Sequence, residues 1–195
     1  MKLVGITGSI GCGKTTLARI LKKMGYAVFD IDGWVRRIYN KKDFLINLEH
    51  LFEGCVVNGV ADKKFLRKIV FNDSEKLKKL ENLIYPYLNK NIKKIITKYA
   101  KNDFICFLDA ALLFEKKWDK FCDFIILADV DYEIQKARVM KRDGISADDF
   151  DKINNVQIKN EDKKKLSDIV VDTNKTLNLL KLELIEILKG LENNG

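Results

Sequence analysis

The feature that most constrains this sequence is the run Gly8–Thr15, which reads GSIGCGKT and matches the pattern G-x-x-x-x-G-K-[ST]. Glycines at these spacings let the backbone curl so that its N–H groups point inward. The apolar run Lys2–Thr7 precedes the loop, and a helical period begins at Lys14. A chance glycine-rich turn with this pattern is expected in on the order of one in a hundred chains of this length. The strand before the loop and the helix after it instead favour a phosphate-binding P-loop.

Each position of the P-loop has an expected part in binding a nucleotide. Backbone N–H groups and the positive end of the helix dipole attract phosphate groups. Lys14 is expected to reach the β- and γ-phosphates, and the Thr15 hydroxyl to ligate Mg²⁺. The predicted nucleotide-binding residues are Gly8, Ser9, Gly11, Cys12, Gly13, Lys14, Thr15 and Thr16.

Short apolar runs recur along the chain and alternate with helical segments. The predicted strands after Lys2–Thr7 are Ala27–Phe29, Phe104–Leu108, Phe124–Leu127 and Ile169–Val171. This alternation favours an α/β fold of the P-loop NTPase type, a five-stranded parallel sheet flanked by helices. Ligands of such sheets bind beyond the carboxyl ends of the strands, so the segments that follow the strands should meet there.

The length of 195 residues suits a single P-loop kinase-type domain, 1–195, with two additions. Residues 43–101 show no convincing strand, and we expect 40–101 to be a helical insertion with a turn at Asn58–Gly59. We expect 132–162 to be a small lid, in which the polar stretch 143–162 suits a mobile segment. No run approaches a membrane span of about 20 apolar residues, and the first residues do not resemble a signal peptide, so we expect a cytoplasmic protein without a membrane partner.

Charge and cysteine content narrow the possible ligands. The net charge is +8, and residues 63–101 hold twelve Lys and Arg against three Asp and Glu. This excess is typical either of solvated helix faces or of a surface that attracts an anionic ligand, nucleotide-like or nucleic acid. The four cysteines form no C-x-x-C pair and the sequence has one histidine, His50, so neither a zinc site nor disulfides are expected.

Acidic residues after the second strand are candidates for proton transfer. Asp30 and Asp32 should lie at the ligand-binding edge of the sheet, where a carboxylate can orient or deprotonate an acceptor hydroxyl. Capping of the following helix is the alternative role for both residues.

Basic residues follow the fourth strand in a spacing that suits a lid. Arg138, Lys141 and Arg142 lie three and four positions apart, near one helix face, where they can neutralise a transferring phosphoryl group. An exposed basic face is the alternative. The segment 174–177, NKTL, lacks the Asp of the guanine motif N-K-x-D, so the sequence fits a small-molecule kinase better than a GTPase.

At this level of detail the chain resembles the dephospho-CoA kinases over nearly its whole length. The start 5–15 is similar to the family's G-L-T-G-G-I-G-S-G-K-S, and 29–32 (FDID) to its I-D-A-D. The segment 109–115 (DAALLFE) resembles D-x-P-L-L-F-E, and Gln135, Arg138 and Arg142 match Q-x-x-R-x-x-x-R. Residues 80–86 resemble L-E-x-I-x-H-P, and Gln157 with 167–171 resembles the closing Q…A-D-x-V-I.

The resemblance implies ATP-dependent phosphorylation of the ribose 3′-hydroxyl of dephospho-CoA, with Mg²⁺ and without a nucleic-acid partner. It implies that Asp32 is the catalytic base, that Lys14, Arg138 and Arg142 stabilise the transition state, and that 40–101 helps to bind the acceptor. Four positions depart from the family pattern, namely Lys63, Tyr85, Ala111 and Thr173. The implied acceptor-binding residues are Asp32, Tyr85, Leu113 and Phe114.

Two other functions remain compatible with the residues. One is a P-loop kinase that acts on a nucleoside, a nucleotide or a small metabolite. The other is a P-loop protein that binds nucleic acid through its basic helices, which predicts salt-sensitive binding and base-stacking aromatic residues.

Overall fold

The computed structural model describes residues 1–71, 73–99 and 104–193, and the chain divides into two compact units. The first unit comprises 1–30 and 101–195, and the second comprises 31–100.

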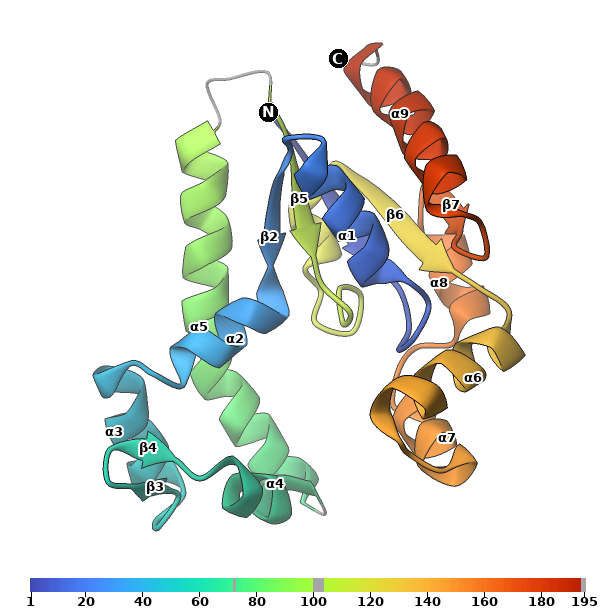
Figure 1. The fold of residues 1–195 in the computed structure, drawn as a ribbon. Coiled ribbons are helices and arrows are strands. Elements are labelled where there is room, and N and C mark those ends of the chain that lie inside the picture. Colours follow the sequence, from blue (N-terminus) through green and yellow to red (C-terminus); the bar gives the residue numbers. More distant parts are fainter. Residues whose placement is uncertain (72, 100–103, 194–195) are drawn as a thin grey trace. The chain divides into compact units, whose positions relative to one another are not determined.

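The first unit is built on five parallel strands in the order β2-β5-β1-β6-β7 (Figure 1). Each predicted strand is present to within two residues, so the predicted α/β fold with a five-stranded parallel sheet is confirmed. Near-continuous apolar runs are what strands need when both of their faces are covered. The strands are β1 (Lys2–Thr7), β2 (Ala27–Asp30), β5 (Ile105–Asp109), β6 (Phe124–Asp129) and β7 (Ile169–Asp172).

Some helices of this unit pack on the sheet, and others carry segments that reach the P-loop. They are α1 (Lys14–Lys23), α6 (Tyr132–Asp143), α7 (Ala147–Asn155), α8 (Asn160–Leu166) and α9 (Leu177–Asn193), with a 3₁₀ turn η1 (Asp119–Phe121). Leucines of α1 and α9 pack together against the sheet in one buried cluster. Its members include Leu17, Leu21, Leu180, Leu184 and Leu188 from the helices and Val4, Ile6, Phe107 and Ile126 from the strands.

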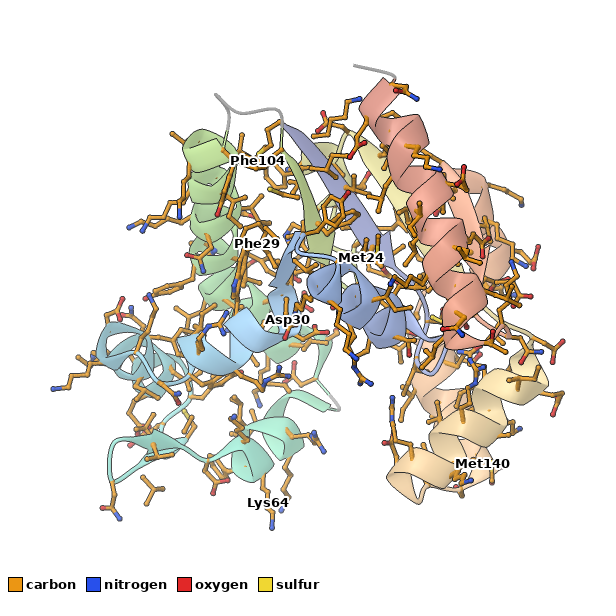
Figure 2. All side chains as sticks on the ribbon, turned by 45° about the horizontal axis from the view of Figure 1, so that its top comes forward. Met24, Phe29, Asp30, Lys64, Phe104 and Met140 are labelled. Carbon is orange, nitrogen blue, oxygen red and sulfur yellow. The ribbon has the colours of Figure 1, made fainter. Side chains whose placement is uncertain are left out.

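The register of the strands collects polar side chains at one edge of the sheet. Asp30, labelled in Figure 2, ends β2 and is paired in register with Asp109 at the end of β5. On the other side of β1, Asp129 of β6 is paired in register with Asp172 of β7. Because the strands are parallel, all these carboxyl ends lie at the same edge, from which the P-loop also leaves β1.

The second unit is mainly helical, with α5 as its longest element. It consists of α2 (Ile31–Ile38), α3 (Lys42–Leu51), the short strands β3 (Val56–Val57) and β4 (Val60–Ala61), α4 (Lys63–Phe71) and α5 (Ser74–Tyr99). The buried face of α5 repeats at helical spacing, with Leu80, Ile84, Leu88, Ile92 and Ile95. Aromatic edges complete the packing, since Phe44 contacts both Tyr39 and Tyr87.

The expectation that 43–101 lacks strands was wrong at one point, because β3 and β4 form a hairpin. Asn58 and Gly59 have φ angles of 51° and 75°, and a two-residue hairpin turn of type I′ requires such positive values at both central residues. The turn at this pair was predicted, but strands of two residues are too short to show an alternating pattern. The stretch 143–162, which we expect to suit a mobile segment, contains α7 and the first residues of α8, and Phe150 is fully buried there.

Within the described residues, no helix has both the length and the apolar character that crossing a bilayer requires.

Helix α5 runs without a break through Pro86, although a proline has no N–H group and its ring crowds the preceding turn. We predict that Pro86→Ala raises the free energy of unfolding by about 1–3 kcal/mol, because an interior proline costs a helix about 3 kcal/mol. Chemical denaturation followed by circular dichroism measures the change, with Lys90→Ala, at an exposed site one turn later, as the control. A loss of stability in Pro86→Ala would contradict the prediction.

The P-loop thiol of Cys12 is fully buried in the core cluster beside α1. Burial raises the pKa of this thiol to about 11, so at pH 8 only about one molecule in a thousand carries the reactive thiolate. We predict that iodoacetamide at pH 8 leaves Cys12 unmodified in the folded protein and modifies it after unfolding in urea. Peptide mass spectrometry distinguishes the two states, and rapid labelling of Cys12 in the folded protein would refute the prediction.

Candidate active site

The P-loop curls because its glycines adopt conformations that other residues avoid and leave room that its neighbours occupy. Gly11 and Gly13 have φ angles of 80° and 87°. A Cβ atom on Gly11 would lie 2.4 Å from Val139 Cγ2 and 3.0 Å from the backbone oxygen of Gln135. A Cβ atom on Gly13 would lie 2.8 Å from the side chain of Thr173. The loop is therefore enclosed by α6 on one side and by the segment after β7 on the other.

The ammonium group of Lys14 forms an ion pair with the carboxylate of Asp109. Asp109 ends β5 and is only 6% exposed, so its charge is compensated inside the site and not by water. The lysine that is expected to bind phosphate is held beside the strand next to β1.

The two predicted lid arginines have different partners. Arg138 donates from Nη1 to Thr173 Oγ1 and from Nη2 to Thr173 O, both at 3.2 Å. Thr173 Oγ1 in turn donates to the P-loop oxygen of Cys12 at 2.8 Å. Arg142 is exposed and forms two hydrogen bonds of 2.7 Å with the carboxylate of Asp143. This pairing raises the pKa of Arg142 and lowers the pKa of Asp143.

The remaining predicted nucleotide-binding residues differ in how much of each side chain is exposed. Thr15 is exposed in the first turn of α1, and Thr16 beside it is half-buried. Ser9 is 4% exposed, and its hydroxyl donates to Asn160 Oδ1. Among the side chains of Ser9, Thr15 and Thr16, the Thr15 hydroxyl is therefore the one most accessible to a ligand.

The predicted acceptor-binding residues are divided between the two units. Leu113 and Phe114 follow β5 in the first unit and are buried, with Leu113 packed close to Gly5. Asp32 is exposed in the first turn of α2, two residues beyond the end of β2. Tyr85 is half-buried on α5. Asp32 and Tyr85 both belong to the second unit.

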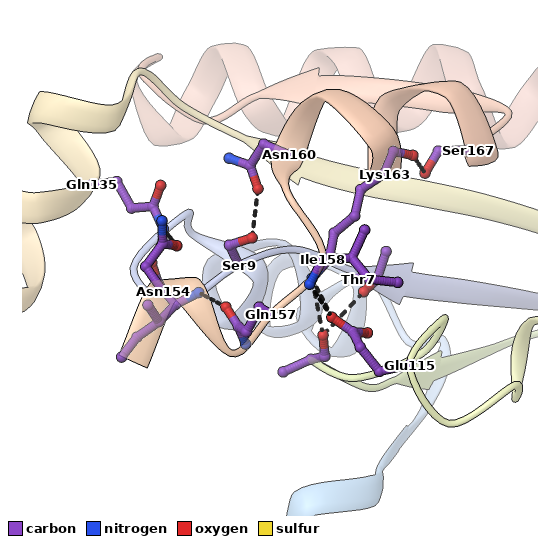
Figure 3. A network of polar contacts seen from close by, with 12 residues as sticks. Thr7, Ser9, Glu115, Gln135, Asn154, Gln157, Ile158, Asn160, Lys163 and Ser167 are labelled. Atoms are coloured by element: carbon purple, nitrogen blue, oxygen red, sulfur yellow. Dashed lines mark hydrogen bonds and ion pairs between the residues drawn. The ribbon is translucent and has the colours of Figure 1, made fainter. Parts of the chain in front are cut away.

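Polar residues to which the sequence analysis gave no chemical role surround the P-loop in a connected network (Figure 3). Gln135 Nε2 donates to the backbone oxygen of Ile10 at 2.5 Å, and the Ile10 N–H donates to Gln157 Oε1 at 3.0 Å. Asn160, which accepts from Ser9, donates from Nδ2 to Asp129 Oδ1 at 3.2 Å. The segment that joins α7 to α8 therefore holds one side of the loop.

A buried ion pair fixes this joining segment to the turn after β5 (Figure 3). Lys163 is completely buried, and its Nζ lies 3.2 Å from Glu115 Oε1 and 3.5 Å from the carbonyl oxygen of Ala111. The same Glu115 oxygen accepts from the Ile158 N–H at 3.0 Å. In the sequence, Lys163 stands in a run of three lysines, and nothing in that run distinguishes the buried one.

Comparison with known proteins gives the same family from a family model and from individual related sequences. The family model described as dephospho-CoA kinase matches residues 2–178. A protein of Bartonella quintana named dephospho-CoA kinase is 38% identical over 195 residues, which cover 100% of both chains. A protein of the same name from Aquifex aeolicus is 38% identical over 175 residues, 88% of each chain.

Solved structures share the fold. The protein TT1252 of Thermus thermophilus aligns over 97% of both chains with a TM-score of 0.84 and 31% identity. A dephospho-CoA kinase from Campylobacter jejuni, 23% identical, aligns over 97% of this chain and 96% of its own with a TM-score of 0.66. Since the family model spans most of the sequence and the full-length relatives exceed 30% identity, the chain belongs to the dephospho-CoA kinase family.

Proposed function

We propose that this protein transfers the γ-phosphoryl group of ATP to the ribose 3′-hydroxyl of dephospho-CoA. The product is CoA, and the reaction is the last step of coenzyme A biosynthesis. The observation that carries the proposal is the likeness along the entire chain to relatives that are named dephospho-CoA kinase. The P-loop, with Lys14 held at the carboxyl edge of the sheet, supports phosphoryl transfer from a nucleotide.

ATP is expected to place its phosphates in the curl of Gly8–Thr15, at the N-terminus of α1. A triphosphate brought there competes with Asp109 for the ammonium group of Lys14. Phosphoryl transfer needs little covalent chemistry from a protein, so positioning and charge compensation are the main contributions expected of these residues.

The residues present fit a Mg²⁺ ion that arrives with the nucleotide. Thr15 offers an exposed hydroxyl, and Asp109 a carboxylate, both of which are oxygen ligands that Mg²⁺ accepts. Among the described residues, no group of three or more His, Cys, Asp or Glu side chains is suited to hold a metal ion. This agrees with an ion held by one or two protein oxygens and by phosphates. When bound, Mg²⁺ would neutralise charge on the β- and γ-phosphates.

Asp32 is proposed as the base that accepts the proton of the 3′-hydroxyl or orients that hydroxyl for in-line attack. Its exposure in the first turn of α2 leaves the carboxylate accessible to a substrate. Lys14, Arg138 and Arg142 are proposed to offset charge in the transition state. Arg138 uses two of the five N–H donors of a guanidinium for Thr173, which leaves donors for an anionic ligand.

The acceptor is proposed to be bound by the insertion 40–101, together with Tyr85, Leu113 and Phe114. The basic excess of 63–101 suits the anionic pyrophosphate of dephospho-CoA. Lys64 on α4, for example, is exposed (Figure 2). Residues 72, 100 and 101 of this segment lie outside the described residues. We propose a cytoplasmic enzyme whose partners are ATP and dephospho-CoA, without a nucleic-acid or membrane partner.

The proposed function predicts which acceptor is phosphorylated. Purified protein with Mg-ATP should form product with dephospho-CoA and not with adenosine, AMP or RNA. Chromatography of the nucleotide products, with [γ-³²P]ATP as the label, measures each reaction. Transfer to adenosine or AMP alone would favour another small-molecule kinase. Salt-sensitive binding of RNA without transfer would favour a nucleic-acid-binding protein.

The proposed base predicts a specific kinetic defect. Asp32→Asn should lower kcat by about 10²–10⁴-fold, the usual contribution of general acid–base catalysis, and leave the KM for ATP near the wild-type value. Asp119→Asn in η1, a substitution of the same chemistry outside every predicted site, serves as the control. Steady-state kinetics with both substrates gives these values. Wild-type turnover in Asp32→Asn would rule out the assignment.

A further inference from the structure

The chain contains only two glutamines, and both bind the backbone of the same P-loop residue, Ile10, one at the peptide unit before it and one at the peptide unit after it. Gln157 Oε1 accepts from the N–H of Ile10 at 3.0 Å, and Gln135 Nε2 donates to the carbonyl oxygen of Ile10 at 2.5 Å. The two glutamines come from different segments, since Gln135 lies on α6 and Gln157 just after the end of α7. Figure 3 shows both segments beside the loop. The donor and the acceptor of Ile10 are thereby both satisfied by side chains.

The two hydrogen bonds are partly buried, and the glutamine side chains are held in place by further contacts. Gln135 is 1% exposed, and its Nε2 also donates to Asn154 Oδ1 at 3.3 Å, so a second contact orients the same amide. Gln157 is half-buried, and the Ile158 N–H that follows it is bound by Glu115. A buried polar group that loses its partner keeps its desolvation cost, so exchange of these bonds with water is unfavourable.

The buried ion pair of Lys163 and Glu115 anchors the segment that carries Gln157. Glu115 Oε1 lies 3.2 Å from Lys163 Nζ and 3.0 Å from the Ile158 nitrogen, so one carboxylate oxygen joins α8 to the residue next to Gln157. Lys163 is completely buried. Breaking a buried pair leaves an uncompensated charge, so the junction of α7 and α8 resists displacement. Gln157 therefore approaches Ile10 from an anchored position.

We propose that Gln135 and Gln157 are positioning residues for nucleotide binding, which fix the two peptide units on either side of Ile10 so that the P-loop is preformed for phosphate. Ile10 stands between Ser9 and Gly11 in a turn that the Cys12 N–H closes by donating to Ser9 O at 3.2 Å, and the two glutamines add side-chain contacts to the residue inside that turn. A loop that is ordered before binding does not lose conformational entropy when the nucleotide arrives. Both glutamines act through the loop and contact no reacting atom. This inference rests on the proposed function, because the proposed function makes ATP the ligand of the P-loop.

The test replaces each amide by an apolar side chain of similar length. Gln135→Met, Gln157→Met and the double variant are compared with Asn155→Met, an exposed position on α7. Isothermal titration with Mg-ADP should show a Kd that is about tenfold higher in each single variant, the order expected from freeing one backbone residue. The KM for ATP should rise to the same extent, and kcat and the KM for dephospho-CoA should stay within about twofold. Asn155→Met should resemble the wild type.

The double variant tests whether the two bonds act together. If both are needed to fix the backbone at Ile10, the double variant should bind Mg-ADP about as weakly as the single variants, whereas independent effects would multiply. Thermal unfolding checks that each variant is folded. If Gln135→Met does not fold, Gln157→Met, at a half-buried position, carries the test of Mg-ADP affinity.

Two outcomes would overturn the inference, and one separates it from the proposed function. Wild-type Mg-ADP affinity in both folded single variants would refute it. So would a loss in kcat at unchanged Mg-ADP affinity. If the wild-type protein binds Mg-ADP but does not phosphorylate dephospho-CoA, the proposed function fails, and the Mg-ADP titrations still decide whether the glutamines position the loop.

Discussion

The tight curl of the P-loop against its neighbours is the constraint on which the rest of the first unit depends. Gly11 and Gly13 have positive φ angles, and neither position has room for a side chain. The room is taken by Val139 of α6 and by Thr173 after β7. A change at either glycine would therefore strain the backbone and displace an element whose own residues hold the loop. The conformation of the P-loop and the position of α6 therefore depend on each other.

Charge compensation follows from the same enclosure. A site for phosphates needs positive charge, but cations buried without partners are costly. In this unit Lys14 is paired with Asp109 at the loop, and Lys163 with Glu115 beneath the joining segment. The two pairs serve different purposes. Under the proposed function an incoming phosphate would replace the carboxylate beside Lys14, whereas the complete burial of Lys163 keeps that pair structural.

The sequence was sufficient to predict what depends on local pattern. Apolar runs predicted all five strands of the parallel sheet, and the glycine spacing predicted the P-loop between β1 and α1. It did not predict the contacts that tie the loop down, because Gln157, Asn160 and Lys163 lie in a polar stretch whose buried members look like its exposed ones. Likewise, the hairpin of β3 and β4 has strands too short to produce a period, and α5 continues through a residue, Pro86, that local rules treat as a break. Tertiary packing decided each of these cases.

The two lid arginines were indistinguishable by spacing, but their contacts suit them to different parts of the proposed reaction. Arg138 is bound to Thr173, which in turn binds the P-loop at Cys12, so withdrawing it would loosen the loop. Arg142 is 60% exposed at its side chain and pairs only with the adjacent Asp143 among the contacts of the described residues, an arrangement that solvent screens. A phosphate can replace such a partner at little cost, and a planar guanidinium binds phosphate through two N–H groups. In the proposed reaction, Arg142 is therefore the better candidate to bind the transferring phosphoryl group. Arg138 is the better candidate to stabilise the conformation of the P-loop through Thr173.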